Sequence, residues 1–291
     1  MEFTKLLPDT TDFRELIDNN CIYVDKTAEI SQFAVKKGPF FISRPRRFGK
    51  STLINTLHEL FAHGIEKFKG LEIEPLWDYK VVHLDFSKFK DVPSSSSFNK
   101  DFMDSLRFSL QRAGIEPTKE QVDFPAKLLE KSIENEDDGA VVLLVDEYDA
   151  PLTAVLNDSN EFEDRRKILS NFYLTVKSFD GKFRFIFVTG VTYYLHTSIF
   201  SAFNNLKELT LDLRYGALLG YTSEELEKYF SEYINNAVDV LNKKYHTERY
   251  THDVVVSELK RNYDGYSFDE EALNHVYNPW SIVNFFDAPV R

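Results

Sequence analysis

The sequence predicts an α/β fold in which a central, mostly parallel sheet is flanked by helices and followed by a C-terminal helical appendage. Apolar runs of strand length alternate with helical stretches through the first two thirds of the chain, and the pattern changes to helical after Gly220. The runs lack strict alternation with polar residues, which is typical of strands buried on both faces of a sheet. Strands that alternate with helices favour right-handed crossovers between parallel neighbours.

These patterns place the elements along the chain. Strands are predicted at 39–43 (PFFIS), 80–86 (KVVHLDF), 140–145 (AVVLLV) and 183–188 (FRFIFV), with a shorter candidate at 209–213 (LTLDL). Helical spacing of the apolar residues predicts helices at 51–61, 99–111, 125–134 and 161–178. The serine run 94–97 fits a loop or the start of a helix better than a domain linker.

A capping box marks the start of the C-terminal part. Thr222 is followed by Glu225, so that the hydroxyl and the carboxylate can satisfy backbone N–H groups at the start of a helix. An amphipathic stretch then runs towards Lys244, and a second helical stretch covers 253–262. We therefore expect residues 1–219 to form the α/β core with an N-terminal extension. Residues 220–291 are expected to form a helical lid or appendage, which the end of the chain truncates.

Composition places the chain among globular proteins. Its 291 residues are 43% hydrophobic and 28% charged, enough to bury a large core. The formal net charge of −12 argues against nonspecific coating of nucleic acid, which needs a surplus of Lys and Arg. The single cysteine, Cys21, cannot form an internal disulfide and indicates a reducing compartment. With neither a signal peptide nor a long apolar run, we expect a cytoplasmic protein without membrane contact.

The strongest chemical signal is the segment Arg44–Thr52 (RPRRFGKST), which lies between a predicted strand and a predicted helix. A phosphate-binding loop occupies that position. Backbone N–H groups at the helix start would face the phosphates, and Gly49 would let the backbone approach them closely. The ammonium of Lys50 would reach the β and γ phosphates, while the Ser51 hydroxyl would bind Mg²⁺.

One position of this loop departs from the usual pattern, because Arg44 stands where the first glycine is normally found. A side chain there is expected to restrict the turn, so that a plain basic loop before a helix remains the alternative. The residues predicted to bind nucleotide are Arg46, Arg47, Phe48, Gly49, Lys50, Ser51 and Thr52. For Arg46 and Arg47 we expect proximity to phosphate.

A second signal is the hydrophobic strand 141–145, which ends in Asp146 and Glu147. It matches a Walker B strand, in which Asp146 would hold Mg²⁺ through water and Glu147 would orient and deprotonate the attacking water. Two acids that begin a solvated loop are the ordinary alternative, but here they occur together with the phosphate loop. Asp149 precedes Ala-Pro, where it is expected to cap a turn without a catalytic role.

Two further segments bear on the reaction. An ATPase that uses a glutamate has an additional strand between the two motifs, and 80–86 is available for that place. Thr189 follows the strand 183–188, where it could touch the γ phosphate or the attacking water, although a turn that ends the strand explains it equally well. The absence of an Asn-Lys-x-Asp guanine signature favours ATP.

Together these motifs resemble the predicted AAA-ATPase-like family of bacterial proteins, in which a PD-(D/E)xK nuclease-like domain often follows the ATPase part. The matching segments are YVDKT at 23–27, RPRRFGKST at 44–52, LLVDEYDAPL at 143–152, FVTGV at 187–191, SIFSAFNNL at 198–206, LLGYTSEEL at 218–226, YDGY at 263–266 and NPWS at 278–281. The family's own loop reads Arg-Pro-Arg-Arg-Phe-Gly-Lys-Ser, with an arginine at the place of Arg44. The resemblance implies a P-loop NTPase fold that binds ATP and Mg²⁺, with Lys50, Ser51, Asp146 and Glu147 in the roles given above.

We therefore expect an ATP-dependent switch: the core binds Mg-ATP, hydrolysis changes contacts near Thr189, and the part after Gly220 moves. Two alternatives stay open. The chain could be a nucleotide-binding regulatory module with little turnover, or the ATPase part of a nucleic-acid-processing protein whose nuclease-like domain is absent here. Nucleic acid is expected only through such a downstream domain, and a homo-oligomer is compatible with the sequence.

Other residues carry weaker signals. The arginine-finger candidates, by residue type alone, are Arg165, Arg166 and Arg214. The triplet Glu258–Lys260 fits a helix surface better than a nuclease site. Tyr263 and Tyr266 fit a tight turn around Gly265 better than a stacking platform for a base. No two histidines stand three or four positions apart, so no histidine metal site is expected.

Overall fold

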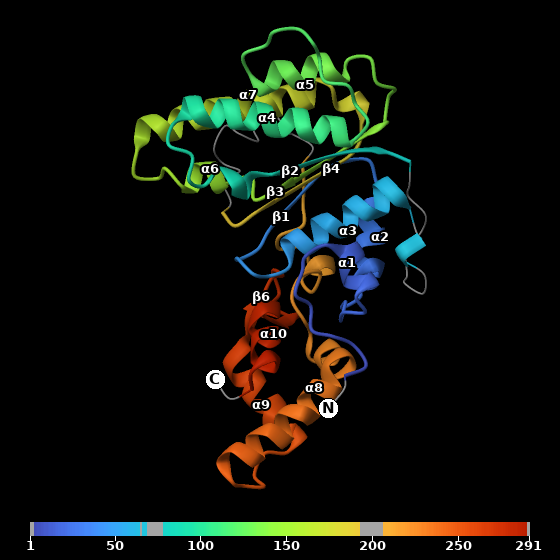
Figure 1. The fold of residues 1–291 in the computed structure, drawn as a ribbon, viewed down its shortest axis with the longest axis vertical. Coiled ribbons are helices and arrows are strands. Elements are labelled where there is room, and N and C mark those ends of the chain that lie inside the picture. Colours follow the sequence, from blue (N-terminus) through green and yellow to red (C-terminus); the bar gives the residue numbers. More distant parts are fainter. Residues whose placement is uncertain (1–2, 65, 69–77, 193–205, 290–291) are drawn as a thin grey trace.

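A parallel β-sheet forms the centre of the protein in the computed structural model, which describes residues 3–64, 66–68, 78–192 and 206–289 (Figure 1). Among these residues, five strands form the main sheet in the order β2-β3-β4-β1-β5, and every neighbouring pair is parallel. The strands are β1 (Gly38–Ser43), β2 (Lys80–Asp85), β3 (Val141–Asp146), β4 (Phe183–Gly190) and β5 (Lys207–Glu208). The predicted α/β class is therefore confirmed.

Helices cover both faces of this sheet, as Figure 1 shows. One face carries α4 (Ser95–Arg112), α5 (Pro125–Ile133), α6 (Ala150–Thr153) and α7 (Ser159–Ser178), and the other carries α1 (Phe13–Asp18), α2 (Thr27–Ala34) and α3 (Lys50–His63). Short 3₁₀ turns are η1 (Glu66–Phe68), η2 (Phe86–Phe89), η3 (Asp180–Lys182) and η4 (Leu213–Tyr215). In β3, Leu143 and Val145 join the core under α4 and α7, whereas Val142 and Leu144 join the core under α3. This two-sided burial explains why the strand is apolar without alternation.

Two strand predictions need correction. The strand between β1 and β3 is β4, and the segment predicted for that place, 80–86, contains β2 at the edge of the sheet beside β3. The order of strands along the chain does not give their order in the sheet, because a crossover helix can connect two strands that are not neighbours in the sheet. The segment 209–213 is not a strand: β5 ends at Glu208, Leu209 N–H still donates to Phe41 O, and the chain then turns into η4.

The C-terminal part contains α8 (Ser223–Tyr245), α9 (His252–Tyr263) and α10 (Pro279–Asp287), with the antiparallel pair β6 (Asp264–Ser267) and β7 (His275–Tyr277). The predicted capping box is present, since Thr222 and Glu225 each bind the other's backbone N–H. The tight turn predicted around Gly265 is wrong, because residues 264–267 form the strand β6. Within the described ranges, no helix is both long and apolar enough to cross a membrane.

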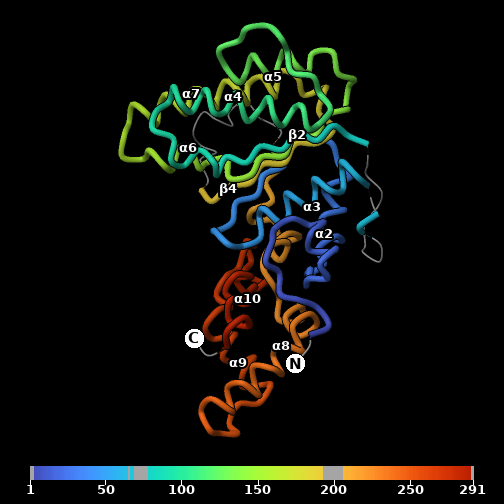
Figure 2. The backbone as a smooth tube through the Cα atoms, viewed as in Figure 1, coloured from blue at the N-terminus to red at the C-terminus, as the bar shows by residue number. Residues whose placement is uncertain are grey.

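The N-terminal segment joins the C-terminal part to the core. Ile22 and Val24 belong to the same hydrophobic cluster as α8, α9 and α10, and the segment follows α8 in Figure 2. Lys26, which is nearly buried, pairs with Glu225 at 2.5 Å and donates to the Ala217 carbonyl at 2.7 Å. Residues from both ends of the chain thus build one packed unit, and a division at residue 220 stays a prediction.

A buried aromatic ring makes a small residue necessary at position 190. A Cβ atom on Gly190 would lie 2.5 Å and 2.7 Å from two ring carbons of Tyr148, which is fully buried. We expect Gly190→Ala to lower the free energy of unfolding by about 1–3 kcal/mol, the usual cost of overpacking, in a urea titration. The control is Gly181→Ala, whose Cβ would meet nothing within 4 Å. Equal midpoints for the two variants would contradict this packing argument.

Candidate functional site

The predicted phosphate loop lies between β1 and the start of α3, at the carboxyl edge of the sheet. Gly49 is the N-cap of α3 with φ of 84°, a left-handed conformation that suits glycine, and it provides no side-chain cap. The first backbone N–H groups of a helix lack partners within the helix, so this end of α3 is suited to an anion. The backbone therefore has the arrangement that the sequence predicts for phosphate binding.

Lys50, the first residue of α3, is folded back into its own loop. Its Nζ atom donates to the carbonyl oxygens of Arg44 and Pro45, each at 2.9 Å, and the residue is only 4% exposed. Burial lowers the pKa of this ammonium, while the charges of Glu147 and Asp146 oppose the shift. The ammonium is therefore held at the centre of the loop and close to the acidic strand.

Arg44 does not restrict the loop in the way that its position suggests. Its backbone keeps a negative φ, and its N–H donates to Gly190 O at 3.1 Å, which extends the pairing of β1 with β4. The buried guanidinium donates to the carbonyl oxygens of Ser43, Thr210 and Tyr215, and it lies 4.3 Å from the centre of the Phe268 ring. A glycine is not required here because the left-handed turns fall later, at Arg47 and Gly49.

The next loop residues contact the C-terminal part. Arg47 has a φ of 68°, and its guanidinium lies 3.9 Å from the centre of the Trp280 ring, at the start of α10. Phe48 is fully buried. Its ring packs in edge-to-face geometry with the rings of Tyr266 and Phe268, with ring centres 4.7 and 5.1 Å apart. We call these contacts the loop latch. Proximity of Arg47, and of the exposed Arg46, to phosphate stays a prediction.

Asp146 lies opposite this loop at the end of β3. Its Oδ2 atom accepts a hydrogen bond from Ser51 Oγ at 2.5 Å, and its other oxygen accepts one from the Thr189 hydroxyl. Burial raises the pKa of this carboxyl group, and the two hydroxyl donors oppose the shift. The two predicted Mg²⁺ ligands, Ser51 and Asp146, are thus in direct contact, although Ser51 lies on α3 and Asp146 at the end of β3.

Thr189 and Lys90 hold the second acid. Glu147 has a φ of 50°, its N–H donates to Thr189 Oγ1 at 3.2 Å, and its Oε2 atom pairs with Lys90 Nζ at 2.7 Å. Thr189 is fully buried beneath both acids, so in this structure it positions Asp146 and Glu147. Its predicted contact with a γ phosphate stays a prediction.

Asp149 was expected to cap the following turn, but its side chain makes no cap hydrogen bond with α6 and binds the chain after β4 instead. Its carboxylate accepts the backbone N–H groups of Val191 and Thr192, with the shorter bond, to Thr192, at 2.6 Å. The side chain is almost fully buried. It ties the loop after β3 to the end of β4, which fixes the chain that carries the two acids.

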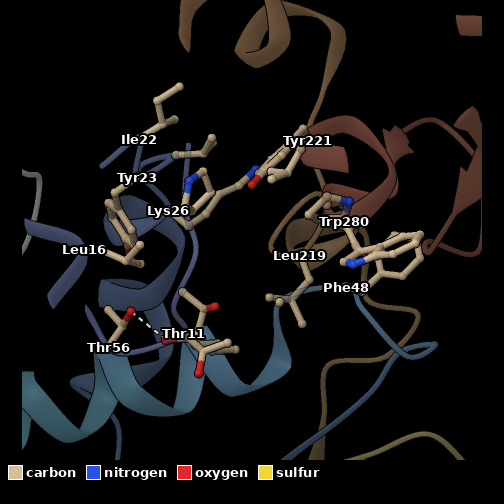
Figure 3. A pocket seen from close by; sticks show the side chains of 18 of the residues that line it. Thr11, Leu16, Ile22, Tyr23, Lys26, Phe48, Thr56, Leu219, Tyr221 and Trp280 are labelled. Atoms are coloured by element: carbon tan, nitrogen blue, oxygen red, sulfur yellow. Dashed lines mark hydrogen bonds between the residues drawn. The ribbon is translucent and has the colours of Figure 1, made fainter. Parts of the chain in front are cut away.

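Two cavities flank the loop and the acids. The apolar cavity, about 330 Å³, borders the loop at Phe48, Gly49 and Thr52. Figure 3 shows Tyr23 and Thr56 on one side of it and Phe48 and Trp280 on the other. The acid-side cavity, about 400 Å³, is lined by Ser51, Asp146 and Glu147 and continues along α3 and β2 to His58, His83, Lys88 and Arg112.

The weaker candidates lie away from this centre or are buried. Arg165 is fully buried and donates to the carbonyl oxygens of Pro151 and Val92, so it cannot serve as a finger to a neighbouring molecule. Arg166 pairs with Glu163, and Arg214 pairs with Asp212 on the surface. The ELK triplet at 258–260 lies on helix α9, as predicted. Most of SIFSAFNNL, residues 198–205, lies outside the described residues.

A Gly-Lys-Ser loop between the first strand and a helix, with an acid-ended strand across from its serine, defines the P-loop class of nucleotide-binding folds. Within that class, the chain belongs to the family described as Predicted AAA-ATPase, whose model matches residues 9–200. A protein of Azotobacter chroococcum mcd 1, described as "Uncharacterized protein in vnfD 5'region", is 31% identical over 268 residues. The match covers 91% of this chain but only 48% of that protein, so the chain spans about half the length of this relative.

Sequence reasoning missed the residues that hold the site in place. Lys90 follows the edge strand, and nothing near it in the sequence indicates a contact with Glu147. Trp280 was noticed only as part of NPWS, far from the loop that it contacts. The signal that could have drawn attention to this contact is the set of four aromatic residues within 266–280, namely Tyr266, Phe268, Tyr277 and Trp280.

The contacts of the Arg44 guanidinium predict that this side chain stabilises the fold. Arg44→Gly would restore the glycine that such loops usually have, yet we expect it to lower the free energy of unfolding by about 3 kcal/mol, because buried carbonyl oxygens lose their donor. Guanidinium denaturation would measure the loss. Arg46→Gly, an exposed change in the same loop, is the control and should differ from the wild type by less than about 1 kcal/mol. A wild-type midpoint for Arg44→Gly would remove the anchoring role.

Proposed function

We propose that this chain binds and hydrolyses ATP with Mg²⁺ and acts as a nucleotide-driven switch. The observation that carries the proposal is the contact of Ser51 with Asp146 beside the ammonium of Lys50, at the uncapped start of α3. This arrangement provides donors for phosphate oxygens and oxygen ligands for a cation at one place. Membership of the Predicted AAA-ATPase family supports the same activity.

Phosphate binding is proposed at the loop. The Lys50 ammonium, now on two loop carbonyls, would exchange them for the β and γ phosphate oxygens. Such an exchange replaces neutral acceptors with charged ones, which makes each hydrogen bond stronger. Backbone N–H groups from Gly49 onwards would complete the cradle.

The donor set fits Mg²⁺. Ser51 and Asp146 present a hydroxyl and a carboxylate 2.5 Å apart, and hard oxygen ligands of this kind are those that Mg²⁺ prefers. In the proposal, these two residues hold the ion, directly or through water. When bound, the ion offsets the negative charge of the phosphates.

Glu147 is the proposed general base. Its main chain is fixed by Thr189, while its carboxylate is held by a single lysine, Lys90, at the edge of the acid-side cavity. In the proposed reaction the carboxylate turns from Lys90 to the attacking water and accepts its proton. Thr189 keeps Asp146 and Glu147 in register during that step.

The apolar cavity is the proposed site of the adenine base. It lies next to Gly49 and Thr52, within reach of a nucleotide whose phosphates occupy the loop, and it offers the aromatic rings of Tyr23 and Trp280. Apolar walls with a few polar groups are usual for nucleotide-sized ligands. Because this cavity is shared between the core and the C-terminal part, base binding would link the two.

Switching is proposed to act through the loop latch. Arg47 contacts Trp280, and Phe48 contacts the rings of β6 and the residue after it, so two consecutive loop residues are held by the C-terminal part. If phosphate draws Arg47 away from Trp280, the loop and this part lose a contact at the moment of binding. A ligand can shift a conformational equilibrium only through such a difference in contacts.

The Lys90 contact also favours a second candidate, a regulatory module that binds nucleotide with little turnover. A base held in an ion pair does not accept a proton until the pair opens. Phosphate release over many turnovers separates the two candidates, because a slow module would stop after about one equivalent. A nucleic-acid-processing output stays a proposal, because the chain spans about half the length of its Azotobacter relative.

Two substitutions test the proposed roles in the reaction. Lys50→Ala should abolish ATP binding in calorimetry, since it removes the ammonium from the loop, whereas the exposed Lys36→Ala should bind as the wild type does. Glu147→Gln should retain binding but lose about 10²–10⁴-fold in turnover, because an amide cannot accept the proton. Equal ATPase rates in the wild type and Glu147→Gln would exclude this base.

Tryptophan fluorescence tests the latch. The chain has two tryptophans, Trp77 and Trp280, so Trp280 reports alone in a Trp77→Phe background. We expect saturating Mg-ATP to change its emission, because the Arg47 guanidinium leaves the ring face. The change should become smaller in Arg47→Ala, where only adenine in the cavity beside Trp280 still alters the emission, and keep its full size in Arg46→Ala. An emission spectrum that ATP leaves unchanged would contradict the proposed switch.

A further inference from the structure

The far end of the acid-side cavity contains a set of donors that the proposed ATP site does not use. His58 lies two turns after Ser51 on α3. His83 lies two residues before Asp85 on β2, and Asp85 is the register partner of Asp146. The two imidazole rings lie 6.0 Å apart between their centres. Arg112, at the end of α4, and Lys88, in η2 just after Asp85, also line this cavity, and both side chains are exposed.

These groups have few partners of their own. Among the described residues, neither Lys88 nor Arg112 forms an ion pair, and the buried His83 Nε2 atom has no hydrogen-bond partner. A buried polar atom without a partner is costly, and each such case needs an explanation. Burial lowers the pKa of His58 and His83 to about 4, so both rings are neutral at pH 7 and can donate an N–H.

We propose that this basic end binds a tetrahedral oxyanion of the phosphate class. Two cations and two neutral imidazoles match the charge and the many acceptor oxygens of such a group. The cavity opens at its other end onto Ser51, Asp146 and Glu147, where the proposed hydrolysis would release phosphate. The oxyanion is either that product or the phosphate group of a second small molecule, and the first source rests on the proposed function.

The acidic residues of the cavity limit where the anion can lie. Asp146 is bound by Ser51 and Thr189, Glu147 by Lys90, and Asp85 accepts the N–H of Ser87. Asp12, also in the lining, accepts the N–H of Glu15 at the start of α1. These carboxylates repel an anion from the end near the loop, and the charge of Asp85 also reaches His83. The favourable place is therefore beside Arg112, whose charge acts on both His58 and His83, with Lys88 as a second cation in the lining.

The test measures direct binding of inorganic phosphate to the full chain in the presence of Mg-ADP. Broadening of the ³¹P signal of phosphate reports the binding. Arg112→Gln should weaken phosphate binding roughly tenfold, the loss expected for one charge-assisted hydrogen bond. Lys88→Gln should act in the same direction and serves if the first variant unfolds. The control is Lys100→Gln, which removes one exposed positive charge from the same helix as Arg112, outside the cavity.

Lys50→Ala separates this site from the phosphate loop. Phosphate binding that survives Lys50→Ala and is weakened about tenfold by Arg112→Gln supports the second site, even if the chain proves to have no ATPase activity. Binding lost in Lys50→Ala and unchanged in Arg112→Gln and Lys88→Gln would overturn the site. If phosphate binds but ATP is not turned over, only the proposed hydrolysis is excluded.

Competition distinguishes the two sources. Phenyl phosphate and inorganic phosphate are titrated against each other in the same Lys50→Ala chain. If the ester binds at least tenfold more tightly, the site holds the phosphate group of a second small molecule. If inorganic phosphate binds at least as tightly, the site holds the product, and Arg112→Gln should also raise the phosphate concentration that inhibits steady-state turnover by a similar factor.

Discussion

The order of three parallel strands is the constraint on which the site depends. With β4 between β1 and β3, the serine after the loop comes within 2.5 Å of Asp146, and the end of β4 lies beneath both acids. Thr189 occupies that end and binds Asp146 and the backbone of Glu147. Asp149, which follows β3, accepts backbone N–H groups of Val191 and Thr192 and so joins the ends of β3 and β4. Side chains from three distant segments are therefore held in place by backbone pairing and buried hydrogen bonds.

The loop obtains its shape from outside the sheet as well. Loops of this class usually rely on glycine for their turns, but here Arg44 extends β1, and its guanidinium holds the chain at Thr210 and Tyr215. Phe48 and Arg47 then bind the C-terminal part through aromatic rings. Buried packing of this kind resists distortion, because interiors are close-packed and rearrange only in discrete steps. The loop cannot change its conformation without changing its contacts with that part.

Local pattern predicted much of this fold, and long-range contact accounts for what it missed. Four strands of the main sheet, the longer helices and the capping box at Thr222 follow from periodicity and from short-range chemistry, whereas α1, α2, α10 and the β6-β7 pair were not predicted. Two strand predictions were wrong because they depend on which strand pairs with which. The segment 80–86 lies at the edge of the sheet, and 209–213 is not a strand. The same holds at the site: Lys50, Ser51 and Asp146 were found by motif, whereas Lys90 and Trp280 lie far away in sequence and reach it only through folding.

Four of the side chains assigned to the nucleotide already have partners within the protein. Lys50 binds two carbonyls, Ser51 binds Asp146, Glu147 binds Lys90, and Arg47 lies on Trp280. Ligand binding at such a site is an exchange of partners, so the net gain is the difference between two sets of contacts and is smaller than either set alone. That difference is what a switch requires. The groups released by the exchange, Lys90 at the edge strand and Trp280 on α10, lie in two separate parts of the molecule, so one binding event would be reported in both.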